Sequence, residues 1–185
     1  MVVKLVTICA PVDYYQVKII ETERLNLRPI SDADAEFILE LMNEPAWIRN
    51  IGDRGLRTAD DACRYISDKI ISAYEQFGFG FYLVELKDSG ERLGISGLVK
   101  RDFLEDVDIG FAFLEKFWSR GYAAESAAAV MNHARKELGL KRIVAITVPD
   151  NQGSIKVLEK IGLRFERLIK LAGEAREIKL FASEI

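Results

Sequence analysis

The sequence is poor in the residues that build disulfides and metal sites. Among 185 residues it has two cysteines, Cys9 and Cys63, and one histidine, His133. These are too few for a disulfide framework or a zinc tetrad, so we expect no metal and, by default, a reducing cytoplasm. A membrane span needs about 20 consecutive apolar residues. The early apolar patch over residues 2–10 is shorter than that and is interrupted by Lys4, so we expect no membrane anchor.

Clustered positive charge is also missing. The chain has 26 basic and 29 acidic residues, a net charge of −3, and no long Lys/Arg run. Phosphate contacts need clustered cations, so we expect no nucleic-acid partner. With 49% hydrophobic residues and so small a net charge, the chain lacks the composition of intrinsic disorder. Its length fits one domain, which we place at residues 19–185 after an extension over residues 1–18.

Alternation and capping signals divide the front half of the chain. Ser31 with Asp34, and Thr58 with Asp61, have the spacing of a capping box at the start of a helix. Pro29 closes the strand-like segment before the first of them. The elements expected here are a strand over residues 18–28, helices over 31–43 and 58–78, and strands over 79–87, 92–100 and 106–114.

The back half has the rhythm of a strand, helix and strand unit. An apolar helical face ends at Gly139, and residues 142–148 form a near-continuous apolar run, typical of a strand covered on both faces. A helix over 152–160 and strands over 163–171 and 174–182 follow. A helical connection implies a parallel pair with a right-handed crossover. The fold class is therefore mixed α/β, with an antiparallel front half.

The turn over residues 118–123 carries the first chemical signal, since it joins a buried strand to an Ala-rich helix. Free N–H groups and the helix dipole favour anions at such a helix start, and Gly121 would let the backbone approach a phosphate. A glycine that merely permits a tight turn is the structural alternative. The Walker pattern and a first-strand GxGxxG are absent, so nucleotide hydrolysis and hydride transfer are disfavoured.

The strand before this turn alternates bulky with smaller residues. Asp108 shares a face with Gly110, Ala112 and Leu114, and the opposite face is bulky. This pattern predicts a shallow groove with a carboxylate, in which a thin chain such as a pantetheine arm would lie. A solvated Asp108 on a half-exposed strand is the alternative.

At this point the sequence resembles a known family. The run from Val107-Asp108-Ile109-Gly110-Phe111 to Trp118-Ser119-Arg120-Gly121-Tyr122-Ala123-Ala124-Glu125 is similar to the acetyl-CoA-binding motif of the GNAT N-acetyltransferases, especially the RimJ/RimL-like branch that modifies protein N-termini and small amines. Glu23-Arg24-Leu25-Asn26-Leu27-Arg28-Pro29 resembles the opening strand of that branch. Asn151-Gln152-Gly153-Ser154 with Lys160-Ile161-Gly162-Leu163 resembles its second motif. The three stretches span roughly residues 20–182.

The resemblance implies a GNAT fold in which the strands over 106–114 and 142–148 splay apart around acetyl-CoA, the acetyl donor. It implies that Phe113 and Leu114 pair with the pantetheine amides and that Asn151 contacts the pantetheine arm. The CoA pyrophosphate would lie on the backbone of Ser119, Arg120, Gly121, Tyr122 and Ala123. The acceptor would be an amine, either a peptide N-terminus or a small molecule.

The sequence departs from the family pattern at the position of the usual general acid. In the generic pattern a tyrosine lies seven residues after the asparagine, and in this sequence that position is Leu158. In the RimJ/RimL-like branch a serine at the position of Ser154 is the usual substitute, so Ser154 is the candidate acid. Its structural alternative is a helix-start residue that bonds backbone groups.

The chemistry of amine acetylation points to Asp108 independently. An ammonium must lose a proton before or during attack on a thioester, and we expect Asp108 to hold the ammonium and order a water, or to act as base if burial raises its pKa. A backbone N–H freed by a strand bulge near Phe113 would stabilise the oxyanion. A CoA-binding or regulatory module without turnover is the alternative function.

The aromatic residues do not identify the acceptor or the oligomeric state. We expect Trp47, in the loop between the first two helices, and Trp118 to be packing anchors, with Trp47 lining the acceptor site as the alternative. The segment over 77–82 is expected to pack in the strand core, with an acceptor wall or a homodimer edge as alternatives. The loops near 47–57 and 168–175 carry no readable acceptor motif.

Overall fold

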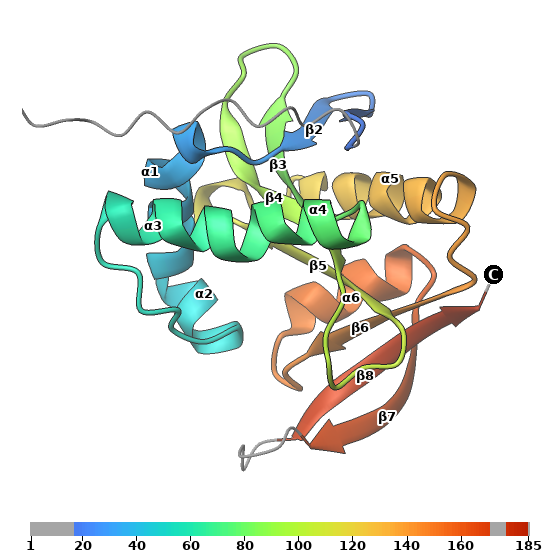
Figure 1. Cartoon of the computed structure of the whole chain (residues 1–185). Coiled ribbons are helices and arrows are strands. Elements are labelled where there is room, and N and C mark those ends of the chain that lie inside the picture. The colour runs from blue at the N-terminus through green and yellow to red at the C-terminus, as the bar shows by residue number, and fades with distance from the viewer. Residues whose placement is uncertain (1–16, 171–176, 185) are drawn as a thin grey trace, which may run out of the picture.

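The computed structural model describes residues 17–170 and 177–184 and contains an eight-stranded sheet of order β1-β2-β3-β4-β5-β6-β8-β7 (Figure 1). Its strands are β1 (Ile20–Glu21), β2 (Leu25–Pro29), β3 (Phe81–Leu86), β4 (Arg92–Val99), β5 (Val107–Phe113), β6 (Arg142–Thr147), β7 (Arg164–Lys170) and β8 (Glu177–Glu184). Among the described strands, β5 and β6 form the parallel pair, and the other neighbours are antiparallel. The predicted mixed α/β architecture is confirmed.

Helices cover both faces of this sheet. They are α1 (Ala35–Asn43), α2 (Pro45–Asn50), α3 (Ala59–Tyr65), α4 (Ser72–Phe77), α5 (Tyr122–Lys136) and α6 (Gln152–Lys160), with the short 3-10 helices η1 (Asp32–Asp34) and η3 (Glu115–Phe117) and the π-helical η2 (Ile66–Ile71). In Figure 1, α3 and α4 lie in front of the sheet and α5 lies behind it. The helix expected over 58–78 is therefore present, with a π-helical middle.

Both predicted capping boxes are formed. The Ser31 N–H donates to Asp34 Oδ2 at 3.0 Å, and the Asp61 N–H donates to Thr58 Oγ1 at 3.1 Å. Each box satisfies backbone N–H groups that the first helical turn leaves without partners. The second helix ends where Gly78 adopts a left-handed conformation, with φ 72°.

Two local predictions were wrong. The single strand expected over 18–28 is a hairpin in which Ile20 lies opposite Leu27. Its turn is made by Thr22, whose Oγ1 accepts from the Leu25 N–H at 2.9 Å, so no glycine or proline marks it. The expected loop around Trp47 is helix α2, which begins at Pro45, a residue well suited to a first helical position.

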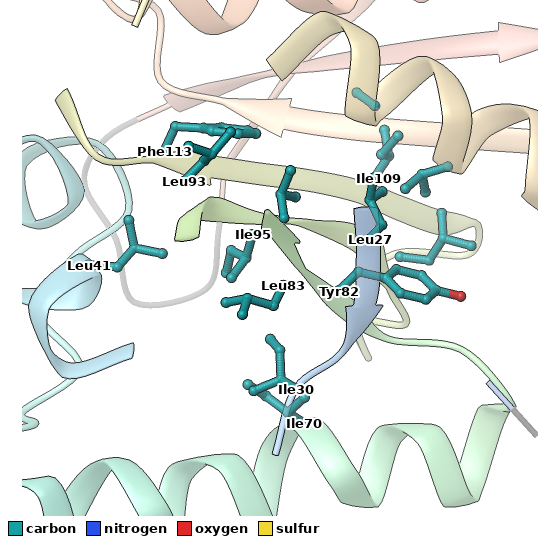
Figure 2. Packing of buried hydrophobic residues seen from close by; sticks show 14 of the residues in the cluster. Leu27, Ile30, Leu41, Ile70, Tyr82, Leu83, Leu93, Ile95, Ile109 and Phe113 are labelled. Carbon is teal, nitrogen blue, oxygen red and sulfur yellow. The ribbon is translucent and has the colours of Figure 1, made fainter. Parts of the chain in front are cut away.

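The hydrophobic core fills both sides of the sheet. Figure 2 shows Ile30 and Ile70 next to each other, between the strands and the helix that carries Ile70. On the other face, the ring of Tyr82 meets His133 of α5 edge-on. Tyr82 and Phe79 are buried, so the expectation that the 77–82 segment packs in the core is confirmed for them. Trp47 is likewise a buried packing residue.

The described residues hold no group of three or more His, Cys, Asp or Glu side chains arranged to bind a metal ion. No described helix combines the length and the apolar character that a membrane crossing requires. The apolar patch over 2–10 and nearly all of the predicted extension over 1–18 lie outside the described residues.

Candidate active site

A gap opens in the sheet between the two parallel strands. β5 and β6 pair at Val107 with Ile143 and at Asp108 with Val144, and the pairing stops there although both strands continue. The predicted splaying of this pair is therefore present. On the other edge of β5 the register with β4 is continuous, from Gly94 opposite Phe113 to Val99 opposite Asp108. The strand bulge predicted near Phe113 is absent, because β6 diverges and no extra residue is needed to free the β5 edge.

The backbone of β5 presents polar groups to this gap. The Leu114 N–H donates to the Leu93 carbonyl at 3.1 Å, so the N–H and C=O of Phe113 point away from β4. Directions alternate along an antiparallel strand, so the backbone groups of Ile109 and Phe111 point the same way. The Ile109 N–H belongs to the last β5–β6 pair, so the groups left at the edge of the gap are those of Phe111 and the N–H of Phe113.

Phe113 and Leu114 differ in which backbone hydrogen-bonding groups face the gap. The Phe113 carbonyl accepts from the indole Nε1 of Trp118 at 2.8 Å, while its N–H faces the gap. The Leu114 N–H is already engaged with β4, and its side chain is buried. Trp118 is 46% exposed, so it ties the following turn to the end of β5 and is no buried packing anchor.

Asp108 lies at the closed end of the gap. It is 1% exposed, and its Oδ2 accepts from Arg101 Nε at 2.5 Å. Its Oδ1 is buried and has no hydrogen-bond partner among the described residues. Burial raises the pKa of Asp108 to about 6, although Arg101 and the backbone N–H of Ile146 on β6 act in the opposite direction. The carboxylate is therefore a buried ionisable group held between the two strands, and its Oδ1 accepts no hydrogen bond from a described residue.

The groove predicted beside Asp108 is partly covered by Phe81, although Gly110 and Ala112 remain partly exposed. The ring of Phe81 lies against Gly110, where an added Cβ would come within 3.1 Å of it. Alternation correctly placed Asp108 on the face of the small residues, but it could not predict that Phe81 from β3 packs against that face at Gly110. The alternative of a solvated Asp108 is wrong as well, because the side chain is buried.

The turn before α5 has the geometry of an anion site. Gly121 caps α5 with φ 84°, and Ser119 also has a left-handed φ of 60°. No side chain in the described part of the chain caps this helix, and its first backbone bond runs from the Glu125 N–H to the Gly121 carbonyl. The N–H groups of Tyr122 and Ala123 therefore lack helical partners. A helix N-terminus of this kind attracts negative charge.

Sequence reasoning missed the pair that holds this turn in place. Arg24 Nε donates to Glu125 Oε2 at 2.7 Å, and Arg24 Nη1 donates to the Arg120 carbonyl at 3.2 Å. The Arg24 guanidinium lies 4.6 Å from the centroid of the Tyr122 ring. Burial raises the pKa of Glu125, but hydrogen bonds from Thr22 and Arg24 outweigh it and the net pKa is lowered. Both partners lie in the stretches that resemble the family, yet nothing in their spacing pairs them.

An open hollow of about 340 Å³ adjoins the turn, between α5 and the end of α6. Arg24 and Lys160 contribute positive charge to its lining, beside Gly121. Glu125, which also lines it, is paired with Arg24. The hollow therefore adjoins the helix N-terminus, and Lys160 leaves its lining with one net positive charge.

The start of α6 follows the end of β6, the strand on the other side of the gap. Asn151 caps α6, and its Oδ1 accepts from the Ser154 N–H at 3.0 Å. In the described part of the chain, the Asn151 amide nitrogen has no hydrogen-bond acceptor, so it remains available to donate. Ser154 is half-buried in the first turn. Leu158 is 1% exposed and belongs to the core, so the position that holds tyrosine in the generic pattern points into the packing.

Comparison with known sequences agrees with this geometry. The family profile described as an acetyltransferase (GNAT) domain matches residues 24–164. The chain is 29% identical over 155 residues to a Bacillus subtilis protein named uncharacterized N-acetyltransferase YoaA, covering 82% of this chain and 86% of that protein. It is 28% identical over 152 residues to the FsC-acetyl coenzyme A-N(2)-transacetylase of Aspergillus fumigatus, covering 78% of this chain and 64% of that protein.

Solved structures show the same fold. A GNAT-family acetyltransferase from Bacillus anthracis superposes with a TM-score of 0.76 at 26% identity, covering 90% of this chain and 98% of that one. The RimL ribosomal L7/L12 alpha-N-protein acetyltransferase in complex with coenzyme A has a TM-score of 0.77 at 20% identity, with coverage of 91% and 98%. With a family profile matched over most of its length and a sheet that splays between β5 and β6, this chain belongs to the GNAT acetyltransferase family.

Proposed function

We propose that this chain is an acetyl-CoA-dependent N-acetyltransferase of the RimJ/RimL-like branch, acting on a primary amine of a peptide N-terminus or a small molecule. The observation that carries the proposal is the uncapped N-terminus of α5 beside a gap edged by free β5 backbone groups. Residues 19–185 would form the catalytic domain, and a reducing cytoplasm is the proposed compartment.

The residues around the gap suit the parts of acetyl-CoA. CoA carries a pyrophosphate, which the N–H groups at Gly121, Tyr122 and Ala123 would bind, with Ser119 and Arg120 completing the turn. Its pantetheine arm is extended and contains amides, so it would add to the open edge of β5 like another strand. The N–H of Phe113 and the amide of Asn151 are placed to donate to that arm. When bound, the thioester supplies the acetyl group.

Asp108 would handle the proton of the amine. Its buried, unpaired Oδ1 would accept from an ammonium or from a water that relays the proton. The amine nitrogen then attacks the thioester carbon, the carbon–sulfur bond breaks, and CoA leaves as thiolate or thiol. A β5 backbone N–H facing the gap would stabilise the oxyanion. Ser154 would donate a hydrogen bond to the departing thiolate, a modest contribution because a thiol pKa is about 8.5 and the thiolate can leave without being protonated.

The competing function is a CoA-binding module without turnover. Two observations favour it: Asp108 is tied to Arg101, and buried Leu158 occupies the position of the usual tyrosine. The two functions are separated by mixing the protein with acetyl-CoA and a panel of amines while monitoring free thiol. We expect thiol release that depends on one class of amine. CoA binding with no thiol release for any amine would establish the module instead.

A further inference from the structure

The loop between β4 and β5 is fixed over the closed end of the gap. Leu104, near its middle, is buried and packs on Val144 of β6. Lys100 Nζ donates to the carbonyls of Leu104 at 2.8 Å and Glu105 at 2.6 Å. Val144 lies opposite Asp108, and residues opposite each other on neighbouring strands share a face of the sheet. The loop therefore covers the face on which Asp108 lies.

Arg101 is held within this loop by three contacts. Its carbonyl accepts from the Leu104 N–H at 3.1 Å, and its guanidinium carbon lies 5.9 Å from the centroid of the Phe103 ring. Its Nε donates to Asp108 Oδ2 at 2.5 Å. The Arg101 side chain is 28% exposed, whereas that of Asp108 is 2% exposed. Arg101 therefore links a buried carboxylate to the protein surface from a fixed position.

Asp108 depends on this contact for its charge. A buried carboxylate without a partner takes up a proton instead of staying ionised. Burial raises the pKa of Asp108 to about 6, and the charge and hydrogen bond of Arg101 act against burial, as does the Ile146 N–H. Arg101 is the cation that pairs with Asp108. Arg101 and Arg54 also act on Tyr65 of α3, but burial raises the pKa of that hydroxyl, so it stays neutral where Asp108 titrates.

We propose that Arg101 is a positioning residue for the acetyl transfer: it keeps the buried Asp108 ionised at neutral pH and, by engaging Oδ2, leaves Oδ1 for the amine or its water. This rests on the proposed function, in which Asp108 holds the ammonium. Arg101 would touch neither substrate and would act through Asp108. A guanidinium suits this role, because it stays charged at every pH of catalysis and its N–H groups fix the direction of the contact.

Three variants separate this role from loop packing. Arg101→Gln removes the charge, and Arg101→Lys keeps it. Arg142→Gln breaks the ion pair of Arg142 with Asp106, two positions from Asp108, and is the control for a lost arginine. For each variant we would measure kcat/KM by thiol release between about pH 5 and 9 and divide it by the wild-type value at each pH, because this division cancels the ionisation of the amine.

The pH dependence of this ratio is the decisive quantity. An adjacent opposite charge shifts a carboxyl titration by about one to three pH units. We therefore expect the Arg101→Gln ratio to be about tenfold lower, or less still, at pH 5 than at pH 9. The ratios for Arg101→Lys and Arg142→Gln should not change with pH. A loss of activity in Arg101→Gln that is equal at every pH would indicate loop packing and overturn the inference.

The Asp108→Asn background gives a second test. If Arg101 acts through Asp108, adding Arg101→Gln to Asp108→Asn should change neither kcat nor its pH dependence. Loss of a counter-ion also destabilises the fold, and removing the Asp108 charge as well should relieve that loss. A double variant as unstable as Arg101→Gln alone would assign Arg101 to packing and overturn the inference, even if Arg101→Gln does not fold.

The ionisation of Asp108 can be measured without turnover. In the full chain labelled with carbon-13 at the aspartate side-chain carboxyls, the NMR signal absent from Asp108→Asn belongs to Asp108. Its titration midpoint should lie at higher pH in Arg101→Gln than in the wild type and should be little changed in Arg101→Lys. An unchanged midpoint in Arg101→Gln overturns the inference. A raised midpoint without thiol release for any amine would refute the proposed function, while the control of Asp108 ionisation by Arg101 would stand.

Discussion

Arg24 and Glu125 are 101 positions apart in the sequence, yet Arg24 Nε donates to Glu125 Oε2 at 2.7 Å directly beside the turn at Gly121. The same carboxylate accepts from Thr22 Oγ1 at 2.6 Å and from the Arg24 backbone N–H at 3.0 Å. The β1–β2 hairpin is therefore fastened to the start of α5. A turn that must bind an anion with backbone groups gains rigidity from a contact that lies outside it.

Removing this carboxylate should loosen both segments. We expect Glu125→Ala to lower the free energy of unfolding by roughly 1–3 kcal/mol, because it leaves several donors without their charged acceptor, and to weaken CoA binding. Urea denaturation and calorimetry measure the two effects. Glu137→Ala is the control, since its ion pair with Lys18 is exposed and such pairs contribute little to stability. Equal effects of the two variants would contradict this role for Glu125.

Gly121 can be tested for both conformation and charge. Its φ of 84° is unfavourable for other residues, and a Cβ there would lie 3.3 Å from Arg24 Nη2. Gly121→Ala should therefore cost about 1 kcal/mol of stability with a small rise in the acetyl-CoA KM. Gly121→Glu should have a similar cost but should raise that KM at least about tenfold more, through repulsion of the pyrophosphate. Equal acetyl-CoA KM values for the two variants would show that the CoA pyrophosphate does not bind at this turn.

Asp108 is the central catalytic prediction. Asp108→Asn should lower kcat on the order of 10²–10⁴ for lost acid–base assistance, with acetyl-CoA affinity nearly unchanged. The wild-type kcat should rise with pH through about 6, the pKa of Asp108, and the variant should lack that rise. Asp106→Asn is the control, because Asp106 is a nearby carboxylate that pairs with Arg142, at 2.9 Å, and is only two positions from Asp108. Loss of activity in Asp106→Asn alone would show that the carboxylate is misassigned.

The buried carboxyl of Asp108 should also shape stability against pH. Burial raises its folded pKa to about 6 from 3.8, so between about pH 4 and 6 the folded state binds more protons than the unfolded state. Stability from this group is then lost as pH rises, by roughly 3 kcal/mol in total. Between about pH 4 and 6, the free energy of unfolding of Asp108→Asn should therefore rise relative to that of the wild type by roughly 3 kcal/mol. Parallel curves would show that the folded pKa is not raised.

Local signals in the sequence predicted most elements because they act over a few residues. The capping boxes at Ser31 and Thr58, and the strand and helix periods, are properties of neighbouring positions. The break at Thr22 was missed because a threonine side chain makes that turn. Helix α2 was missed because six residues are too few to show a helical period.

The candidate site was predictable only in part, for the same reason. Alternation placed Asp108 on the correct face of β5, and the resemblance identified the turn at Gly121. The partners that decide their chemistry come from elsewhere in the chain. Arg101 reaches Asp108 across a loop, and Arg24 reaches Glu125 from the first hairpin. Tertiary packing brings these pairs together, so the periodicity of neighbouring residues could not predict them.

Asn151 combines two roles that one substitution can separate. Its Oδ1 caps α6 through the Ser154 N–H, and its amide nitrogen is proposed to donate to the pantetheine arm. Asn151→Asp keeps the capping oxygen and adds a negative charge at a helix N-terminus, which is favourable, but it removes the amide donor. We expect unchanged or slightly higher thermal stability and an acetyl-CoA KM raised several-fold. Asn151→Ala, which loses both groups, should cost about 1 kcal/mol of stability as well. If Asn151→Asp binds acetyl-CoA as well as the wild type does, Asn151 is a helix cap and nothing more.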